Sequence, residues 1–266
     1  MPDRHFNGNY VSYWKERVDK PMDGSRVADE RILDFYIRQL GIVEKDKVLD
    51  LGCGYGRLYP LLSRYSQRIV GADISYDMLA AAAEFSYDCL FEASAENTRA
   101  ADGFFNHIVV WGVYDVVDQE KSLVEFNRIL NKGGRLLITG KNYSYDPMDE
   151  PAFIAERNAK LKNFPNHFTD TAAFKRMIKW FGFKIHKAFA FQNRGDLGEN
   201  RYVDISDNHL DLFYEFVIIL EKSHQPLPDP PQFSHEFSNV AKLRSMAAGY
   251  ENIVDFFSWH QATAVS

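Results

Sequence analysis

Three glycines and two acids form the part of this sequence whose spacing best suits the binding of a nucleotide-like ligand. Gly52, Gly54 and Gly56 lie between an apolar run that contains Asp50 and a second apolar run with helical spacing. Glycine is needed where the backbone takes a positive φ or where a ligand leaves no room for a Cβ atom. The pattern therefore predicts a strand, a tight ligand-binding turn and a helix. Another acid, Asp73, ends the next apolar run, about 20 residues further on.

The elements that position these residues alternate between strand and helix. Apolar runs that end at turns predict strands, and apolar residues at helical spacing between them predict helices. The predicted strands cover residues 48–51, 68–73, 88–94, 105–110, 135–140, 184–191 and 212–221. This order predicts an α/β fold: a mostly parallel seven-stranded sheet with helices on both faces and an antiparallel edge strand. Such sheets bind their ligands at the carboxyl ends of the strands.

Segments outside the alternating pattern divide the chain further. Residues 1–25 carry aromatic side chains among charges and are predicted to form a cap or lid. Residues 26–222 form the main domain, with an insertion over about 142–168. A long connection at the carboxyl end of a strand often carries specificity. A proline-rich linker over 223–232 leads to residues 233–266, which are predicted to form a helical tail.

Composition narrows the class of protein and its partners. The chain of 266 residues has a net charge of -6, which gives no electrostatic reason to expect a nucleic-acid partner. The amino terminus has no apolar signal-like region, and no run approaches the roughly 20 apolar residues of a membrane span. Cys53 and Cys89 are too few for a disulfide scaffold and lack metal-site spacing. We therefore expect a soluble, cytoplasmic protein without a metal site.

Four segments together resemble the class I S-adenosylmethionine-dependent methyltransferases, a Rossmann-like superfamily. They are DLGCGYG, VGADIS, EFNRILNKGGRLLI and FYEFVIILEK. A lone glycine fingerprint also occurs in NAD-binding proteins, but its combination with the later glycine pair before a strand is more specific. The resemblance covers roughly residues 26–222. It implies that S-adenosylmethionine is the cofactor and S-adenosylhomocysteine the product.

The resemblance also implies roles for particular residues. The turn from Gly52 would approach the methionine moiety, with Asp50 near its ammonium group, and Asp73 would accept the ribose hydroxyls. Related enzymes often have an acid after the third strand for the adenine amino group, and Ser94 stands there in this chain. The other positions assigned to the cofactor are Cys53, Gly54, Gly56, Ile74, Ala95, Glu96, Trp111 and Gly112.

The acceptor site is predicted to be aromatic. A base is needed if the acceptor is a hydroxyl or a protonated amine. His167, in the insertion, is the candidate base, with Tyr13 as a further candidate catalytic residue. Candidate acceptor-binding residues are Tyr10, Trp14, Tyr114, Asn142 and Tyr143. In the superfamily that the sequence resembles, an Asn-Pro-Pro-Tyr motif after the fourth strand marks methylation of planar nitrogens in nucleic acid or glutamine. This motif is absent from the sequence, which together with the acidic net charge favours a small-molecule acceptor. Within that class we expect a hydroxyl of a sugar or another metabolite, a choice that no motif in the sequence fixes.

Other functions remain open. The acceptor atom could be nitrogen, or the chain could be a noncatalytic cofactor-binding subunit that needs a partner. An NAD(P)-dependent oxidoreductase would also use a glycine turn, but its Tyr-x-x-x-Lys helix motif is not seen. The tail offers a contact for a homodimer.

Overall fold

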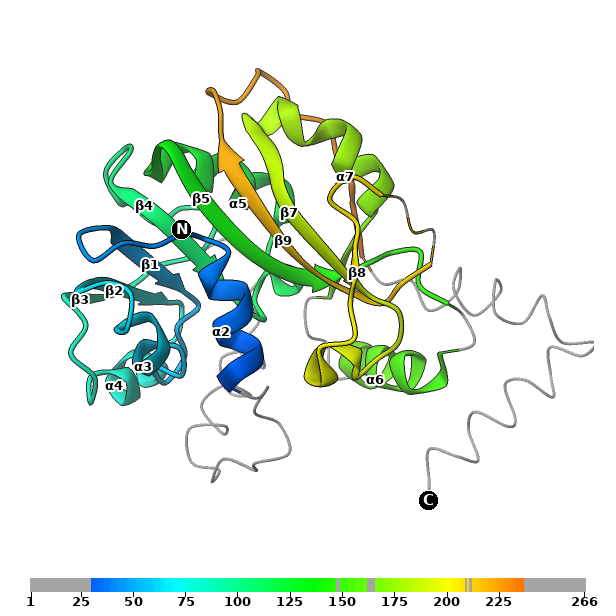
Figure 1. The fold of residues 1–266 in the computed structure, drawn as a ribbon, viewed down its shortest axis with the longest axis horizontal. Helices are drawn as coiled ribbons and strands as arrows, with labels where there is room; N and C mark the ends of the chain where they lie inside the picture. Colours follow the sequence, from blue (N-terminus) through cyan, green and yellow to red (C-terminus); the bar gives the residue numbers. More distant parts are fainter. Residues whose placement is uncertain (1–29, 147–148, 162–165, 209, 211, 237–266) are drawn as a thin grey trace, which may run out of the picture.

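An eight-stranded sheet forms the centre of the protein, with strand order β3-β2-β1-β4-β5-β9-β7-β8 (Figure 1). The structure is a computed structural model that describes residues 30–146, 149–161, 166–208, 210 and 212–236. The strands are β1 (Lys47–Leu51), β2 (Arg68–Asp73), β3 (Cys89–Glu92), β4 (Phe105–Val110), β5 (Leu130–Lys141), β7 (Phe183–Phe191), β8 (Val203–Asp204) and β9 (Glu215–Lys222). The strands from β1 to β5 pair in parallel, whereas β9 is antiparallel to β5 and β7.

The predicted sheet with an antiparallel edge is confirmed. Its edge has more detail than the sequence indicated, because β9 lies between β5 and β7 and the outermost strand is β8. Strand β8 has two residues, Val203 and Asp204, which pair with β7. A strand this short has no detectable period in the sequence, which is why seven strands were expected.

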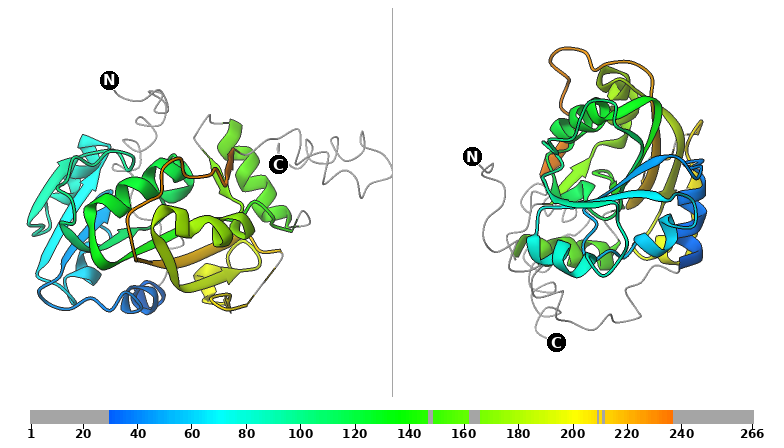
Figure 2. Two further views of the ribbon diagram at one scale, coloured as in Figure 1. Left: turned by 90° about the horizontal axis from the view of Figure 1, so that it is seen from above. Right: turned by 90° about the vertical axis from the view of Figure 1, so that its left-hand side faces the viewer.

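Helices cover both faces of the sheet, as the alternating side chains of the strands require. In β9, Phe216, Ile218 and Leu220 belong to one buried cluster, and Val217 and Ile219 belong to the other. The first face is covered by α5 (Gln119–Ile129) and α7 (Thr171–Met177), and the second by α2 (Glu30–Arg38) and α3 (Tyr59–Leu62). Figure 2 shows α2 and α5 on opposite sides of the sheet. The remaining elements are α4 (Tyr76–Ala82), α6 (Glu150–Leu161), η2 (Tyr114–Val116), η3 (Ile178–Phe181), η4 (Asp196–Glu199), β6 (His167–Thr169) and β10 (Ser234–Glu236).

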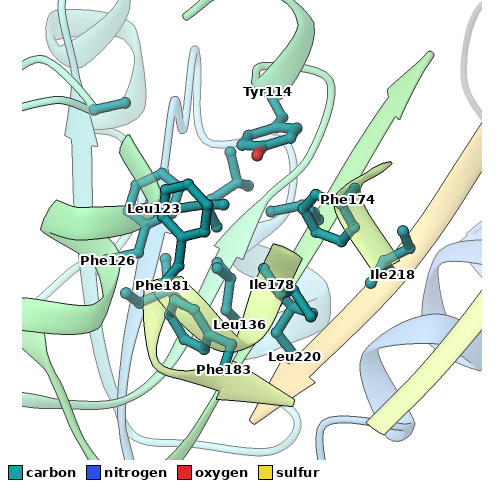
Figure 3. Packing of buried hydrophobic residues seen from close by; sticks show 14 of the residues in the cluster. Tyr114, Leu123, Phe126, Leu136, Phe174, Ile178, Phe181, Phe183, Ile218 and Leu220 are labelled. Carbon is teal, nitrogen blue, oxygen red and sulfur yellow. The ribbon is translucent and has the colours of Figure 1, made fainter. Parts of the chain in front are cut away.

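Aromatic side chains fill the core on the face covered by α5 and α7 (Figure 3). Phe126, Phe174, Phe181 and Phe183 are each at most 1% exposed and belong to one cluster with strand residues of β5 and β9. Tyr114 of η2 lies at the upper end of this cluster, next to the loop that follows β4. The core therefore directly supports that loop.

The carboxyl-terminal part of the described chain corrects one prediction. Residues 234–236 were expected in a helix, but they form β10, which pairs antiparallel with β6. Phe233 is 1% exposed and packs against Phe174 and Phe181, and the backbone amides of Phe233 and Ser234 donate to Glu120 at 2.7 Å. The proline-rich segment 223–232 is therefore held against the domain at its end, because its continuation is anchored in the core.

Several predictions concern residues outside the described ranges. They are the lid over residues 1–25, the start of the helix predicted over 26–40, and the tail from residue 237 onward. In the ranges that are described, no helix has the length and the apolar character needed to cross a membrane.

Candidate active site

The glycine turn connects β1 to α3 and is held against β2. The amides of Gly52 and Cys53 both donate to the carbonyl of Ala72, at 2.7 and 3.0 Å. Gly52 has a φ of +72°, and a Cβ atom there would stand 2.3 Å from Cγ2 of Val113 in the loop after β4. The turn therefore fits between two neighbouring strand ends only because this position lacks a side chain.

A cavity of about 300 Å³ lies beside this turn, at the carboxyl ends of β1, β2 and β4. Its walls come from the turn, from the start of α4 and from the loops after β3 and β4. The lining residues are Asp50, Leu51, Gly52, Cys53, Gly54, Tyr55, Arg57, Leu58, Asp73, Ile74, Met78, Ala93, Ser94, Ala95, Trp111, Gly112, Val113, Val116 and Val117. Such a position agrees with the ligand site expected for a parallel sheet.

Asp50 is a buried carboxyl group at one end of the cavity. Its Oδ2 accepts a hydrogen bond of 2.8 Å from the hydroxyl of Tyr87. Burial raises the pKa of Asp50 to about 7, Tyr87 opposes this shift, and the negative charge of Asp73 adds to it. A cationic ligand group beside Asp50 would favour its ionised form.

Asp73, at the end of β2, shapes the turn as well as the cavity. Its two carboxylate oxygens accept hydrogen bonds of 2.9 Å from the amides of Gly54 and Ser75. Burial raises the pKa of Asp73, and these amide hydrogen bonds oppose the shift. Because an ionised carboxylate can accept about four hydrogen bonds, Asp73 retains capacity for a diol.

The loops after β3 and β4 close the other side of the cavity. Glu96 accepts a hydrogen bond of 2.9 Å from the amide of Asp118, which ties the two loops together. Gly112 donates its amide to Oγ1 of Thr139 on β5 at 2.7 Å. Trp111 packs at the edge of the second core cluster. The walls between these points are largely apolar, which suits a flat aromatic ligand group.

Most residues assigned to the cofactor by resemblance line this cavity, and two do not. Gly56 is buried away from it, because a Cβ atom there would stand 2.4 Å from Cδ2 of Phe85. Glu96 is engaged in joining the loops. Gly56 therefore serves the packing of the turn, and Glu96 the packing of the loops.

The candidate acceptor residues are more scattered. Tyr114 is fully buried in the core, which corrects its prediction as an acceptor wall. Asn142 is also buried: its amide donates to the carbonyls of Ser144 and Phe213, and its oxygen accepts from Thr171, so its polar atoms serve the backbone and a neighbouring helix.

Three predicted residues precede the part of the chain that the structure describes, and two others lie together outside the cavity lining. Tyr10, Tyr13 and Trp14 are outside the described residues. His167 begins β6, and the ring of Tyr143 packs on His235 of β10 with 4.6 Å between centroids. The β6–β10 ribbon therefore gathers Tyr143, His167 and His235 into one region.

Sequence reasoning missed two polar residues of the site, Arg57 and Tyr87. Arg57 directly follows the third glycine and lines the cavity. Tyr87 precedes β3 and reaches Asp50. The adjacency of Arg57 to the turn was the available signal, whereas nothing local in the sequence indicates that Tyr87 approaches Asp50.

A further group of ionisable side chains lies where β5 and β9 meet the insertion. Nζ of Lys141, at the end of β5, is 2.8 Å from Asp115 and 3.2 Å from Glu156 of α6. Burial raises the pKa of Glu215, at the start of β9, to about 7, although Lys141 lowers it. Asp115 belongs to η2, and the next residue of that helix, Val116, lines the cavity. The charged group and the cavity are therefore connected through one short helix.

Comparison with known proteins agrees with this geometry. Residues 49–138 match a family model described as a methyltransferase domain. A ubiquinone/menaquinone biosynthesis C-methyltransferase of Syntrophotalea carbinolica is 26% identical over 147 residues, which cover 52% of this chain and 62% of the relative. Phosphoethanolamine N-methyltransferase 1 of Zea mays is 28% identical over 155 residues, or 56% of this chain and 30% of the relative. The chain thus spans less than two thirds of either relative.

A solved structure extends the likeness beyond the matched domain. The complex of the Haloferax volcanii Trm112 methyltransferase activator with a methyltransferase gives a TM-score of 0.60 at 15% identity, covering 84% of this chain and 100% of that chain, which shows the fold. Residues 49–138 therefore form a methyltransferase domain, and the fold is that of the class I S-adenosylmethionine-dependent methyltransferases. This family uses S-adenosylmethionine as methyl donor.

The cavity itself fits that cofactor. Gly54 and Gly112 have positive φ angles, and nothing lies within 4 Å of where their Cβ atoms would stand, so the backbone faces open space at both positions. Asp50 and Asp73 supply negative charge, and Arg57 supplies positive charge. A ligand with cationic groups, a carboxylate and a ribose diol would find a partner for each.

Proposed function

We propose that this chain transfers the methyl group of S-adenosylmethionine to a small molecule, with a hydroxyl oxygen of a sugar or another metabolite as the acceptor. The observation that carries the proposal is the cavity in which the glycine turn, Asp50 and Asp73 meet the loop after β4. Bound there, the cofactor would supply an electrophilic methyl group on a sulfonium centre. The protein would align the acceptor and exclude water.

Each cofactor-binding residue would contact the part of the cofactor that its side-chain chemistry suits. Asp73 would accept the ribose hydroxyls, and Asp50 would face the ammonium group, because each is a carboxylate at a strand end beside the turn. Ile74 and Val117 would pack on the adenine, with Ser94 in reach of its polar edge. Trp111 would stand near the sulfonium, where an aromatic face favours a cation.

A hydroxyl acceptor needs a group that takes its proton. His167 is the proposed base, since histidine is the side chain that most often acts as a general base. The ribbon that carries His167 is tied to the loop after β4: Thr169 donates to Gln119 at 2.8 Å, and Gln119 donates to the carbonyl of Tyr114 at 3.1 Å. This connection supports a place for His167 on the acceptor side.

The proposed reaction is tested with methyl-labelled cofactor. The full chain is incubated with [methyl-13C]-S-adenosylmethionine and a panel of sugars, hydroxy acids, amines and activated carbon acids. The 13C shift of the transferred methyl group distinguishes oxygen, nitrogen and carbon products. Methylation of amines or carbon acids alone would refute the hydroxyl proposal and keep the methyltransferase.

The other classes of function predict different results. A noncatalytic subunit would bind S-adenosylhomocysteine but give no product until a partner chain is added. An oxidoreductase would bind NAD(P) instead. Calorimetry with both ligands therefore separates these readings before any acceptor is known.

We expect His167→Gln to lower the turnover number about 100-fold, the lower end of what a general base contributes, with unchanged S-adenosylhomocysteine affinity. The matched control is His224→Gln, because His224 is exposed and its imidazole forms a hydrogen bond with the carbonyl of Gln225, outside the cavity lining. Steady-state kinetics on the identified acceptor provides the measurement. Equal activity of both variants would remove His167 from catalysis.

Asp50 should make cofactor binding depend on pH. Its pKa is about 7 in the folded protein, against 3.8 for an unperturbed aspartate. The folded state therefore holds an extra proton between these pH values, and ionisation of Asp50 lowers stability as the pH rises through that window. A bound ammonium group favours the ionised form. S-adenosylhomocysteine affinity should therefore fall about tenfold from pH 8 to pH 6.

The Asp50→Asn variant isolates this effect. We expect weaker binding at pH 8 and no further loss at pH 6, measured by calorimetry at both pH values. Glu84→Gln changes an exposed carboxylate and should keep the wild-type pH dependence. If Asp50→Asn also keeps the wild-type pH dependence, a group other than Asp50 causes it.

A further inference from the structure

Arg57 presents two buried donor atoms that have no acceptor among the described residues. Its Nε and Nη2 atoms are both buried and make no hydrogen bond within that part of the chain. Within the part of the chain that the structure describes, no ion pair joins Arg57 to a carboxylate. Leaving donors of a charged group unsatisfied costs more than leaving neutral ones. A ligand bound in the cavity is one source of the missing acceptor.

The carboxylates of the cavity already have other partners. Asp50 accepts from the hydroxyl of Tyr87, and Asp73 accepts from the amides of Gly54 and Ser75. Arg57 lines the same cavity. The guanidinium of Arg57 thus lies in the same cavity as the carboxylates of Asp50 and Asp73 but forms no ion pair with them. The cavity can therefore bind both a cationic and an anionic group of one ligand.

The identity of the two atoms indicates the shape of the missing acceptor. Nε and Nη2 form one edge of the planar guanidinium, with two N–H donors pointing the same way. This edge matches the two oxygens of a carboxylate and forms two parallel hydrogen bonds with it. A single carbonyl or hydroxyl would satisfy only one of the donors.

We propose that Arg57 is the specificity-determining residue that binds the carboxylate of the amino-acid end of the cofactor through its Nε–Nη2 edge. The inference rests on the proposed function, since it takes the cavity to be the cofactor site. Arg57 lies between Gly56 and Leu58, so it is fixed to the turn that faces the methionine moiety. Arg57 would bind the carboxylate of the methionine moiety and Asp50 its ammonium group, so both charged groups of that moiety would have a partner.

A carboxylate in this cavity could come from the cofactor or from an acidic acceptor. The test uses Arg57→Gln, which keeps hydrogen bonding but loses the charge, and Arg57→Lys, which keeps the charge but loses the two-pronged edge. The probes are S-adenosylhomocysteine and 5′-methylthioadenosine, which lacks both the carboxylate and the ammonium group. Calorimetry on the full chain measures each Kd, and thermal unfolding checks that the variants are folded.

We expect Arg57→Gln to weaken S-adenosylhomocysteine binding about 10- to 100-fold and to leave 5′-methylthioadenosine binding unchanged within about twofold. Arg57→Lys should lie between wild type and Arg57→Gln. Decarboxylated S-adenosylmethionine, which lacks only the carboxylate, should bind the wild type and Arg57→Gln equally.

Two results would overturn the proposal for Arg57, and a third would reject the function on which it rests. Equal losses for S-adenosylhomocysteine and 5′-methylthioadenosine would show that Arg57 only supports the turn. Unchanged cofactor binding with a raised KM for a carboxylate-bearing acceptor would assign the carboxylate to the acceptor. Failure of the wild type to bind S-adenosylhomocysteine would instead reject the proposed function itself, which separates the two failures.

Discussion

Replacing Gly52 with alanine is expected to weaken S-adenosylhomocysteine binding at least about 100-fold and to lower the free energy of unfolding by about 3 kcal/mol. Two causes add. The φ of +72° is strained for alanine, and the new Cβ would stand 2.3 Å from Cγ2 of Val113. Since Val113 lines the cavity, relief of the clash moves either the turn or the wall. Calorimetry and chemical denaturation measure the two effects.

Two further glycines separate the causes. Gly133 has a φ of +77° with open space around its Cβ position, and it lies outside the cavity lining, so Gly133→Ala measures the backbone strain alone. Gly54→Ala has similar strain, but its Cβ would point into open space beside the cavity, so only ligand binding should suffer further. In a Gly52→Ala background, Val113→Ala should restore part of the stability. Equal effects of Gly52→Ala and Gly133→Ala would contradict the clash.

The parts of the site that could be predicted from the sequence are those encoded locally. The spacing of Gly52, Gly54 and Gly56 indicates a turn, and all three have positive φ angles. Asp73 ends a strand of the expected length and lies beside that turn. The spacing of apolar residues likewise predicted the sheet and its helices, because burial on one or both faces of an element gives a regular pattern of apolar residues in the sequence.

What could not be predicted depends on contacts between distant segments. Tyr114 follows the cavity loop, so it resembled an acceptor wall, but the turn of η2 directs its ring into the core. The sequence places Arg57 directly after the glycine turn, but only the fold shows that its donors are buried. Residues 234–236 were predicted to lie in the helical tail, yet pairing with β6, far earlier in the chain, makes them a strand.

Replacing Lys141 with methionine is expected to lower the free energy of unfolding by about 3 to 5 kcal/mol, because it removes the cation shared by buried carboxylates. Nζ of Lys141 contacts Asp115 at 2.8 Å and both oxygens of Glu156 at 3.2 and 3.3 Å. Glu156 is 1% exposed, and its other partners are the hydroxyl of Tyr214 and the amide of Asn166. Methionine fills a similar volume without the charge, so the loss is electrostatic.

The matched control is Lys184→Met, since the Lys184–Glu221 pair has the same 2.8 Å separation but a lysine that is 61% exposed, and should cost at most about 1 kcal/mol. Burial opposes the charged form of Lys141, but Asp115 and Glu156 outweigh it and raise its pKa. Its contribution is therefore complete below the unfolded value of 10.5, and lysine titration should leave the loss unchanged between pH 6 and 9.

A consequence for ligand binding separates Lys141 from an ordinary structural ion pair. Asp115 belongs to η2, which also carries Val116 of the cavity wall, and Glu156 belongs to the insertion. Loss of Lys141 should therefore loosen the cavity wall and weaken S-adenosylhomocysteine binding, and a second change, Glu156→Gln, should recover stability by removing the unpaired buried charge. Stability losses as small as those of Lys184→Met would show that the carboxylates are satisfied without the lysine.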